Sequence, residues 1–110
     1  MNIAEEQIEA VFEKVHQCKF AYAEAAEVLV DAKKELEIAK LEGLASGAIE
    51  GKNAELREAA ARELLPNAYI YLETAEKRER EAKFDLDTAY LDYDCLKMLM
   101  RLAELQDKRE

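Results

Sequence analysis

The sequence predicts an all-α protein, a long antiparallel helical hairpin of coiled-coil type with a short helix at its apex. The first reason is a pair of 3-4 repeats, one on each side of a middle segment that contains glycines and a proline. The second is composition, since 50% of the residues are apolar and 37% are charged, which is typical of long helices. A narrow apolar seam is buried only against another such seam, so the two helices should fold back on each other as one domain, residues 1–110.

We call the residues of these two repeats the inner seam. In the first half it comprises Ala4, Ile8, Val11, Val15, Cys18, Tyr22, Ala25, Leu29, Ala32, Leu36 and Ala39. In the second half it comprises Ala68, Leu72, Ala75, Glu79, Ala82, Leu86, Ala89, Tyr93, Leu96, Met100 and Ala103. A small residue recurs at every seventh position, which lets two backbones approach closely. With the turn centred near residue 55, Val11 should lie roughly opposite Met100.

The first helix is expected over residues 2–44, with its start near Asn2 or Ile3 and the acidic Glu5 and Glu6 in its first turn. A turn and a short helix should occupy residues 45–66. Asn53 is a suitable N-cap for the short helix, since its side chain can accept from the first free amides.

Pro66 should end the short helix and can also stand in the first turn of the last one, where its missing N–H costs nothing. The last helix is expected over residues 67–106.

A second apolar row on the last helix, here called the outer stripe, points away from the inner seam. It comprises Phe84, Thr88, Leu91, Cys95, Met98, Leu102 and Leu105. The first helix has a patchier counterpart in Phe12, Phe20, Ala23, Val30, Ile38 and Leu41. One partner helix cannot cover both faces, and exposed apolar stripes mark interfaces. We expect a homodimer in which two hairpins form a four-helix bundle; the alternative is docking onto a different protein.

The formal charge of −9 argues against general nucleic-acid binding, which depends on lysine and arginine. Bases at Lys77, Arg78, Arg80 and Lys83 alternate with glutamates, which favours pairing along a solvated face over a phosphate or RNA site. The net negative charge lies in residues 1–44 and 84–110, because acids and bases nearly balance in the middle of the chain. An acidic inhibitor that mimics nucleic-acid charge and blocks a host protein is therefore an alternative function.

Catalytic, cofactor-binding and metal-binding residues are not predicted. Glu13 and His16 form a Glu-x-x-His pattern known from di-iron bundles, but both fall outside the inner seam. Cys18 and Cys95 are expected to be free, buried thiols. The Met1 end has neither a basic segment nor a long apolar run, so a signal peptide and a membrane span are not expected, and the predicted location is the cytoplasm.

The segment from Gly51 to Ala59, followed by Tyr69, Leu72 and a charged helix, resembles small acidic helical-hairpin proteins of tailed phages and prophages. The likeness covers roughly residues 45–90. It implies a non-enzymatic accessory factor that acts through protein–protein contacts, in which Asn53 and Arg57 cap and pin the middle turn. The residues alone also favour an interaction or scaffold module.

Overall fold

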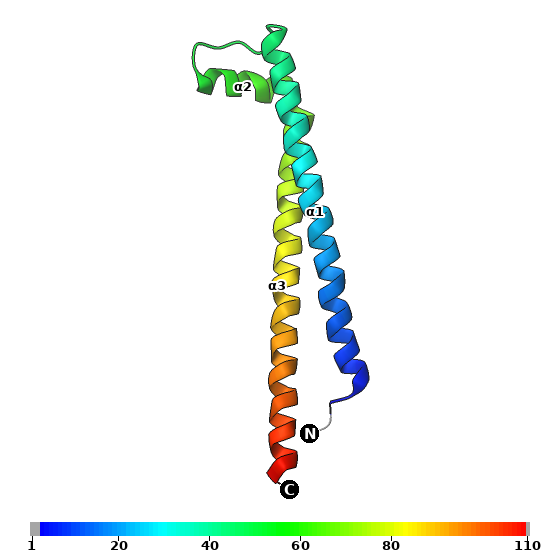
Figure 1. Cartoon of the computed structure of the whole chain (residues 1–110). Helices are drawn as coiled ribbons and strands as arrows, with labels where there is room; N and C mark the ends of the chain where they lie inside the picture. The colour runs from blue at the N-terminus through cyan, green and yellow to red at the C-terminus, as the bar shows by residue number, and fades with distance from the viewer. Residues whose placement is uncertain (1–2, 110) are drawn as a thin grey trace. The chain divides into compact units, whose positions relative to one another are not determined.

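The structure, a computed structural model, describes residues 3–109, and within them it contains three α-helices and no strand. The helices are α1 (Glu5–Ala45), α2 (Ala54–Leu64) and α3 (Pro66–Arg109), shown in Figure 1. The all-α class predicted from the sequence is confirmed. No helix in this part of the chain combines the length and the apolar character needed to cross a bilayer.

The start of α1 lies slightly later than expected, because Ala4 caps it. The Ala4 N–H donates to Oε1 of Gln7 at 3.0 Å, and the Ala4 carbonyl accepts from the Gln7 N–H at 3.0 Å. Ile3 therefore precedes the helix, and Asn2 lies outside the described residues. Glu5 and Glu6 occupy the first turn, where carboxylates favour the positive end of the helix dipole.

The loop after α1 is shaped by two glycines. Gly47 has a positive φ of 80°, which a residue with a side chain adopts only with strain. The chain then turns back, so that the Ile49 N–H donates to the Gly43 carbonyl at 2.9 Å. Ile49 is buried over Gly43, and a Cβ on that glycine would lie 2.5 Å from Ile49 Cδ1. Gly43 is thus the residue that lets the loop fold onto α1.

Leu65 and Pro66 separate α2 from α3. The residue before a proline is disfavoured in the α region, and Leu65 has φ −122° and ψ 51° accordingly. Its N–H closes α2 on the Ala61 carbonyl at 2.8 Å, and its own carbonyl accepts from Tyr69 at 3.2 Å. Pro66 is the first residue of α3, and this helix runs three residues past the expected end at residue 106. The basic Lys108 and Arg109 suit its last turn.

The described residues form two compact units. Unit 1 holds the residues up to Glu24 and those from Arg80 onward, and unit 2 is Ala25–Glu79. In unit 1, α1 lies against α3, with the Phe12 and Tyr93 rings 5.3 Å apart and Lys19 Nζ 5.7 Å from the Tyr90 ring. The later residue of α1 contacts the earlier residue of α3, so these segments are antiparallel.

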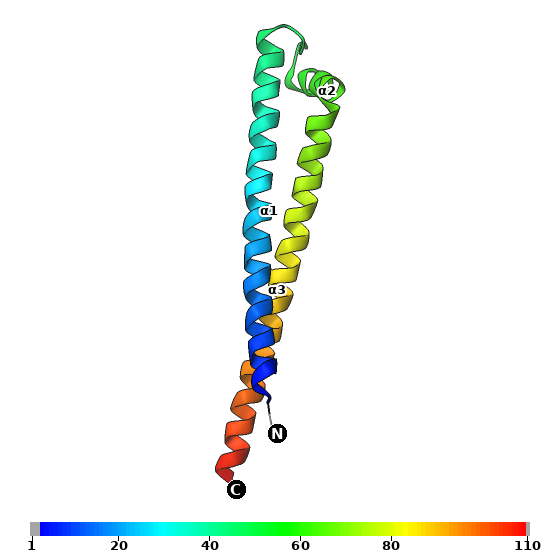
Figure 2. The same ribbon diagram turned by 90° about the vertical axis from the view of Figure 1, so that its right-hand side faces the viewer.

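Unit 2 has its own small core, where α2 lies beside the end of α1 and the start of α3 (Figure 2). Leu36, Ile49, Ala61 and Tyr69 form this cluster, each less than a tenth exposed. Every helix and the loop contribute one residue to it. The core of unit 2 therefore depends on the fold of the loop as well as on the helices.

The inner seam accounts for most of the buried side chains. On α1 it buries Cys18, Ala25, Ala32 and Leu36, and on α3 it buries Ala75, Ala82, Ala89 and Leu96. The most completely buried of these are alanines, Ala25, Ala32, Ala75 and Ala89, each at most 2% exposed, as close helix packing requires. Glu79, the charged member, is half-buried. In unit 1, Val11 borders a groove with Leu96 and Leu99, so α3 is shifted by roughly one turn from the expected pairing of Val11 with Met100.

Candidate interaction surface

The outer stripe lies on α3 within unit 1, and its side chains are exposed. Phe84 is 70% exposed, Leu91 68% and Met98 73%. Leu102 and Leu105 are also among the exposed large apolar residues, and Cys95 is an exposed free thiol. All six proposed interface residues are therefore exposed on one side of α3. The prediction from the sequence that Cys95 is buried is wrong.

The two faces of α3 point in nearly opposite directions. In unit 1, the two buried alanines of α3 are each followed two residues later by a large residue of the outer stripe, Ala82 by Phe84 and Ala89 by Leu91. Two residues correspond to about 200° around a helix. In unit 1, α1 therefore packs on the inner-seam side of α3 and leaves the large residues of the outer stripe exposed, while Cys95 borders a groove with Val11 of α1.

The patchier apolar row of α1 is open too. Phe12 is 53% exposed and Phe20 62% in unit 1, while Val30, Ile38 and Leu41 are exposed in unit 2. Phe12 is partly covered by its contact with Tyr93, and Phe20 packs edge-on against His16 at 4.8 Å between ring centres. This row is therefore less continuous than the outer stripe.

His16 contacts an aromatic ring, and Glu13 accepts a hydrogen bond from Gln17 at 3.3 Å. Within residues 3–109, no group of three or more His, Cys, Asp or Glu side chains is arranged to hold a metal ion. Cys18 is buried and Cys95 exposed, and both are free thiols.

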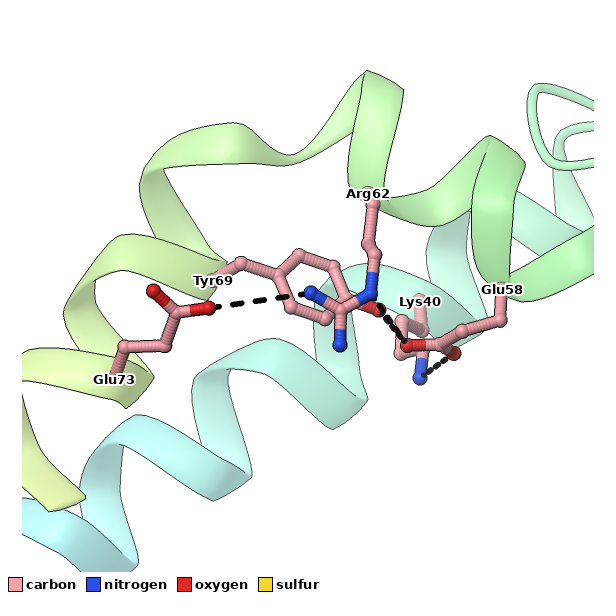
Figure 3. Close-up of polar contacts among 5 residues, drawn as sticks. All are labelled: Lys40, Glu58, Arg62, Tyr69 and Glu73. Carbon is pink, nitrogen blue, oxygen red and sulfur yellow. Dashed lines mark hydrogen bonds and ion pairs between the residues drawn. The ribbon is translucent and has the colours of Figure 1, made fainter.

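A second distinctive site, here called the polar cluster, ties the three helices of unit 2 together (Figure 3). Lys40 of α1 lies 2.6 Å from Oε2 of Glu58 on α2, and the Tyr69 hydroxyl of α3 donates to Oε1 of the same carboxylate at 2.6 Å. Arg62 sits over the Tyr69 ring, 4.5 Å from its centre. Its guanidinium also reaches Glu58 at 3.7 Å and Glu73 at 4.0 Å.

These contacts shift the pKa values of three groups. The hydrogen bonds from Lys40 and then Tyr69 lower the pKa of Glu58 from its ordinary value of 4.5. The hydrogen bond to Glu58 raises the pKa of Lys40 from 10.5. Burial, reinforced by the hydrogen bond to Glu58, raises the pKa of Tyr69 from 10.0. The cluster therefore holds its charged carboxylate, ammonium and neutral phenol together over the neutral pH range.

Sequence reasoning missed this cluster. Only the spacing of Glu58 and Arg62, four residues apart on one helix, was a readable signal. Tyr69 is buried in the core of unit 2, whereas Tyr71, two residues later, is 37% exposed. What brings Lys40 to Glu58 is the direction of α2, which the loop and Leu65 determine.

Asn53, Arg57 and Pro66 were proposed to structure the turn, and each has a defined local role. The Asn53 side chain accepts from the Leu56 N–H at 2.9 Å and caps α2. Arg57 donates to the Gly51 carbonyl at 3.3 Å, which ties the first turn of α2 back to the loop rather than to another helix. Pro66 begins α3.

No protein-family model, curated protein or solved structure matches this chain.

Proposed function

We propose that this chain is a non-enzymatic protein–protein interaction module that acts as a homodimer, built by self-association of the outer stripe. The observation that carries the proposal is the exposure of Phe84, Leu91 and Met98, each by about two thirds or more. Large apolar side chains in an unbroken row along one helix lose contact with water when a partner covers them, which favours association.

In the proposed dimer, the α1 and α3 segments of unit 1 from each copy form a four-helix assembly that buries one seam within each helical pair and a second between the pairs. The inner seam supplies the first and the outer stripe the second. Because these two faces of α3 are nearly opposite, the two α3 segments meet at the centre and each α1 lies outside its own α3, a flatter arrangement than the four-helix bundle expected from the sequence. We place the dimer in the cytoplasm as an accessory or scaffold factor of the phage type that residues 45–90 resemble.

The test is the mass in solution, measured by light scattering across a range of concentrations. We expect the wild-type protein at about twice its chain mass of 12.6 kDa, and Leu91→Glu as a monomer with unchanged helical circular dichroism. Leu56→Glu is the matched control: Leu56 is 51% exposed on α2, outside the stripe, and this variant should stay dimeric. Leu86→Glu, in the inner seam, should lose helical structure instead.

A wild-type monomer at every concentration would overturn the homodimer and leave the outer stripe to a different protein. An unchanged dimer in Leu91→Glu would show that the stripe is not the interface.

The net charge of −9 favours one second candidate, an acidic inhibitor that occupies a basic nucleic-acid-binding surface. Exposed aspartates at positions 85, 87, 92 and 94 of α3 would supply part of that charge. Such binding should weaken steeply with salt, because exposed charges are screened. Adding the chain to a complex of duplex DNA with a basic, nonspecific DNA-binding protein should then release the DNA at low salt. Failure to release DNA at any salt concentration would exclude this candidate.

A further inference from the structure

The charges beside the outer stripe change sign along α3. One flank consists of the residues directly before Thr88, Cys95 and Leu102, continued one heptad further: Asp87, Asp94, Arg101 and Lys108. The other flank consists of the residues directly after Phe84, Leu91, Met98 and Leu105, namely Asp85, Asp92, Leu99 and Gln106. All eight are exposed. The first half of the stripe is thus bordered by acids, and the second half by bases on one side and uncharged residues on the other.

The stripe itself has the spacing of a coiled-coil seam. Phe84, Leu91, Met98 and Leu105 recur every seventh residue, with Thr88, Cys95 and Leu102 between them. This regular alternation extends over about 33 Å of helix at 1.5 Å per residue. In coiled coils the apolar seam supplies the contact, and the flanking charges select the partner and its direction. The flanks therefore indicate what covers this face.

We propose that the outer stripe pairs with the same stripe of a second copy in antiparallel orientation, about a twofold axis that passes between residues 96 and 97. The inference rests on the self-association proposed above and adds its direction and register. The layers formed across the axis are Cys95 with Met98 of the second copy, Leu91 with Leu102, and Thr88 with Leu105.

An antiparallel pair brings each flank against the same flank of the second copy, because a twofold axis perpendicular to both helices keeps each flank on its own side. Asp94 then faces Arg101 of the second copy, and Asp87 faces Lys108. Symmetry repeats both pairs, which gives four opposite-charge contacts. On the other flank Asp92 meets Leu99, so no like charges are opposed there. Asp94 also lies 3.4 Å from Lys97 of its own helix, and a carboxylate can accept from both cations.

A parallel pair is less complementary. Its twofold axis runs along the helices and brings opposite flanks together, so a residue of the first flank meets the residue five positions further on in the second copy. Asp87 would then face Asp92, twice, which is repulsive. Arg80 would face Asp85, also twice, and Asp94 would face the uncharged Leu99. Two attractive contacts would therefore be set against two repulsive ones, and the antiparallel arrangement is favoured.

Charge reversal tests the direction. In the antiparallel dimer, Asp94→Arg places arginine against Arg101, and Arg101→Asp places aspartate against Asp94. Each variant alone should dimerise about tenfold more weakly than the wild type, as expected for two exposed ion pairs turned into repulsions. An equimolar mixture of the two should recover wild-type affinity as a heterodimer, since every opposed pair is then complementary. The measurements are sedimentation equilibrium and native mass spectrometry.

Glu104→Arg and Lys83→Asp are the matched controls. They change the net charge by the same amounts at exposed positions of α3 outside both flanks, and they should leave the dimer unchanged. A wild-type dimer that Leu91→Glu disrupts but that neither Asp94→Arg nor Arg101→Asp weakens would overturn the antiparallel register alone. Weakening of both variants without recovery on mixing would overturn it too. A monomeric wild-type protein would instead refute the proposed self-association itself.

Cysteine pairing gives an independent readout of the same register. In a background with Cys18→Ala and Cys95→Ala, Thr88→Cys and Leu105→Cys variants should form a disulfide with each other on mixing and mild oxidation. Neither should cross-link to itself, because both positions lie far from the twofold axis. Self-cross-linking of each variant, without a mixed product, is the result expected of a parallel dimer and would overturn the inference.

Discussion

Replacing Leu36 by alanine should destabilise the core of unit 2 more than any substitution on the open faces of α1. Leu36 is 7% exposed and packs in the cluster with Ile49, Ala61 and Tyr69. Truncation of a buried leucine to alanine removes its transfer free energy and leaves a cavity, together about 2–5 kcal/mol. Because this cluster is small and lies near the surface, its neighbours can relax inward, and we expect about 2–3 kcal/mol.

The assay is equilibrium unfolding in urea, followed by helical circular dichroism at one fixed protein concentration, since the proposed association would make stability depend on concentration. The midpoint should fall without a change in slope, as for a loss of stability in an otherwise intact fold. Leu36→Met, which conserves volume, should cost less than about 1.5 kcal/mol. Leu41→Ala is the exposed control on the same helix, 59% exposed, and should stay within about 0.5 kcal/mol of the wild type. Equal losses for Leu36→Ala and Leu41→Ala would refute the assignment of faces on α1.

Two further predictions concern the ends of α2 and its attachment. Asn53→Ala should lower the free energy of unfolding by about 1 kcal/mol in the same urea assay, because the Leu56 amide loses its acceptor. Asn53→Ser should retain most of the stability. An unchanged midpoint for the alanine variant would show that the cap is not needed. The lowered pKa of Glu58 means that its stabilisation is present above the ordinary glutamate pKa and is lost as the pH falls through the lowered value. The protection factors of the α2 amides, which are corrected for the intrinsic slowing of exchange in acid, should therefore fall more in the wild type than in Glu58→Gln as the pH is lowered below 4.5. Parallel profiles of the two proteins would contradict this role.

The helices and their buried faces could be predicted from the sequence because periodicity alone determines them. A small residue at every seventh position, as at Ala25 and Ala32, indicates which side of a helix faces a close neighbour. The same reasoning separated Leu91 from Leu86, and the structure shows the first exposed and the second half-buried. Helix ends were less accurate, since they depend on single contacts such as that between Ala4 and Gln7.

The polar cluster could not be predicted in the same way. Lys40 and Glu58 are separated by 18 residues, and Glu58 and Tyr69 by 11. These contacts depend on the backbone angles at Gly47 and Leu65, where the chain turns. The spacing of residues in the sequence does not predict those angles. The sequence shows that these charged and aromatic residues are present, but their proximity depends on the three-dimensional path of the loop.

The arrangement of α3 makes folding and the proposed association separable properties of this chain. The alanines at 75, 82 and 89 are buried in the inner seam, while Phe84 and Leu91 point outward about half a turn away. Substitution of an exposed stripe residue such as Leu91 should therefore disturb the packing of unit 1 little, whereas substitution at the inner seam should disrupt the pairing of α1 with α3 in unit 1. Variants of the flanking aspartates and basic residues should therefore change the partner geometry at nearly constant monomer stability. That separation is what allows charge reversal on one helix to report the direction of pairing rather than a loss of fold.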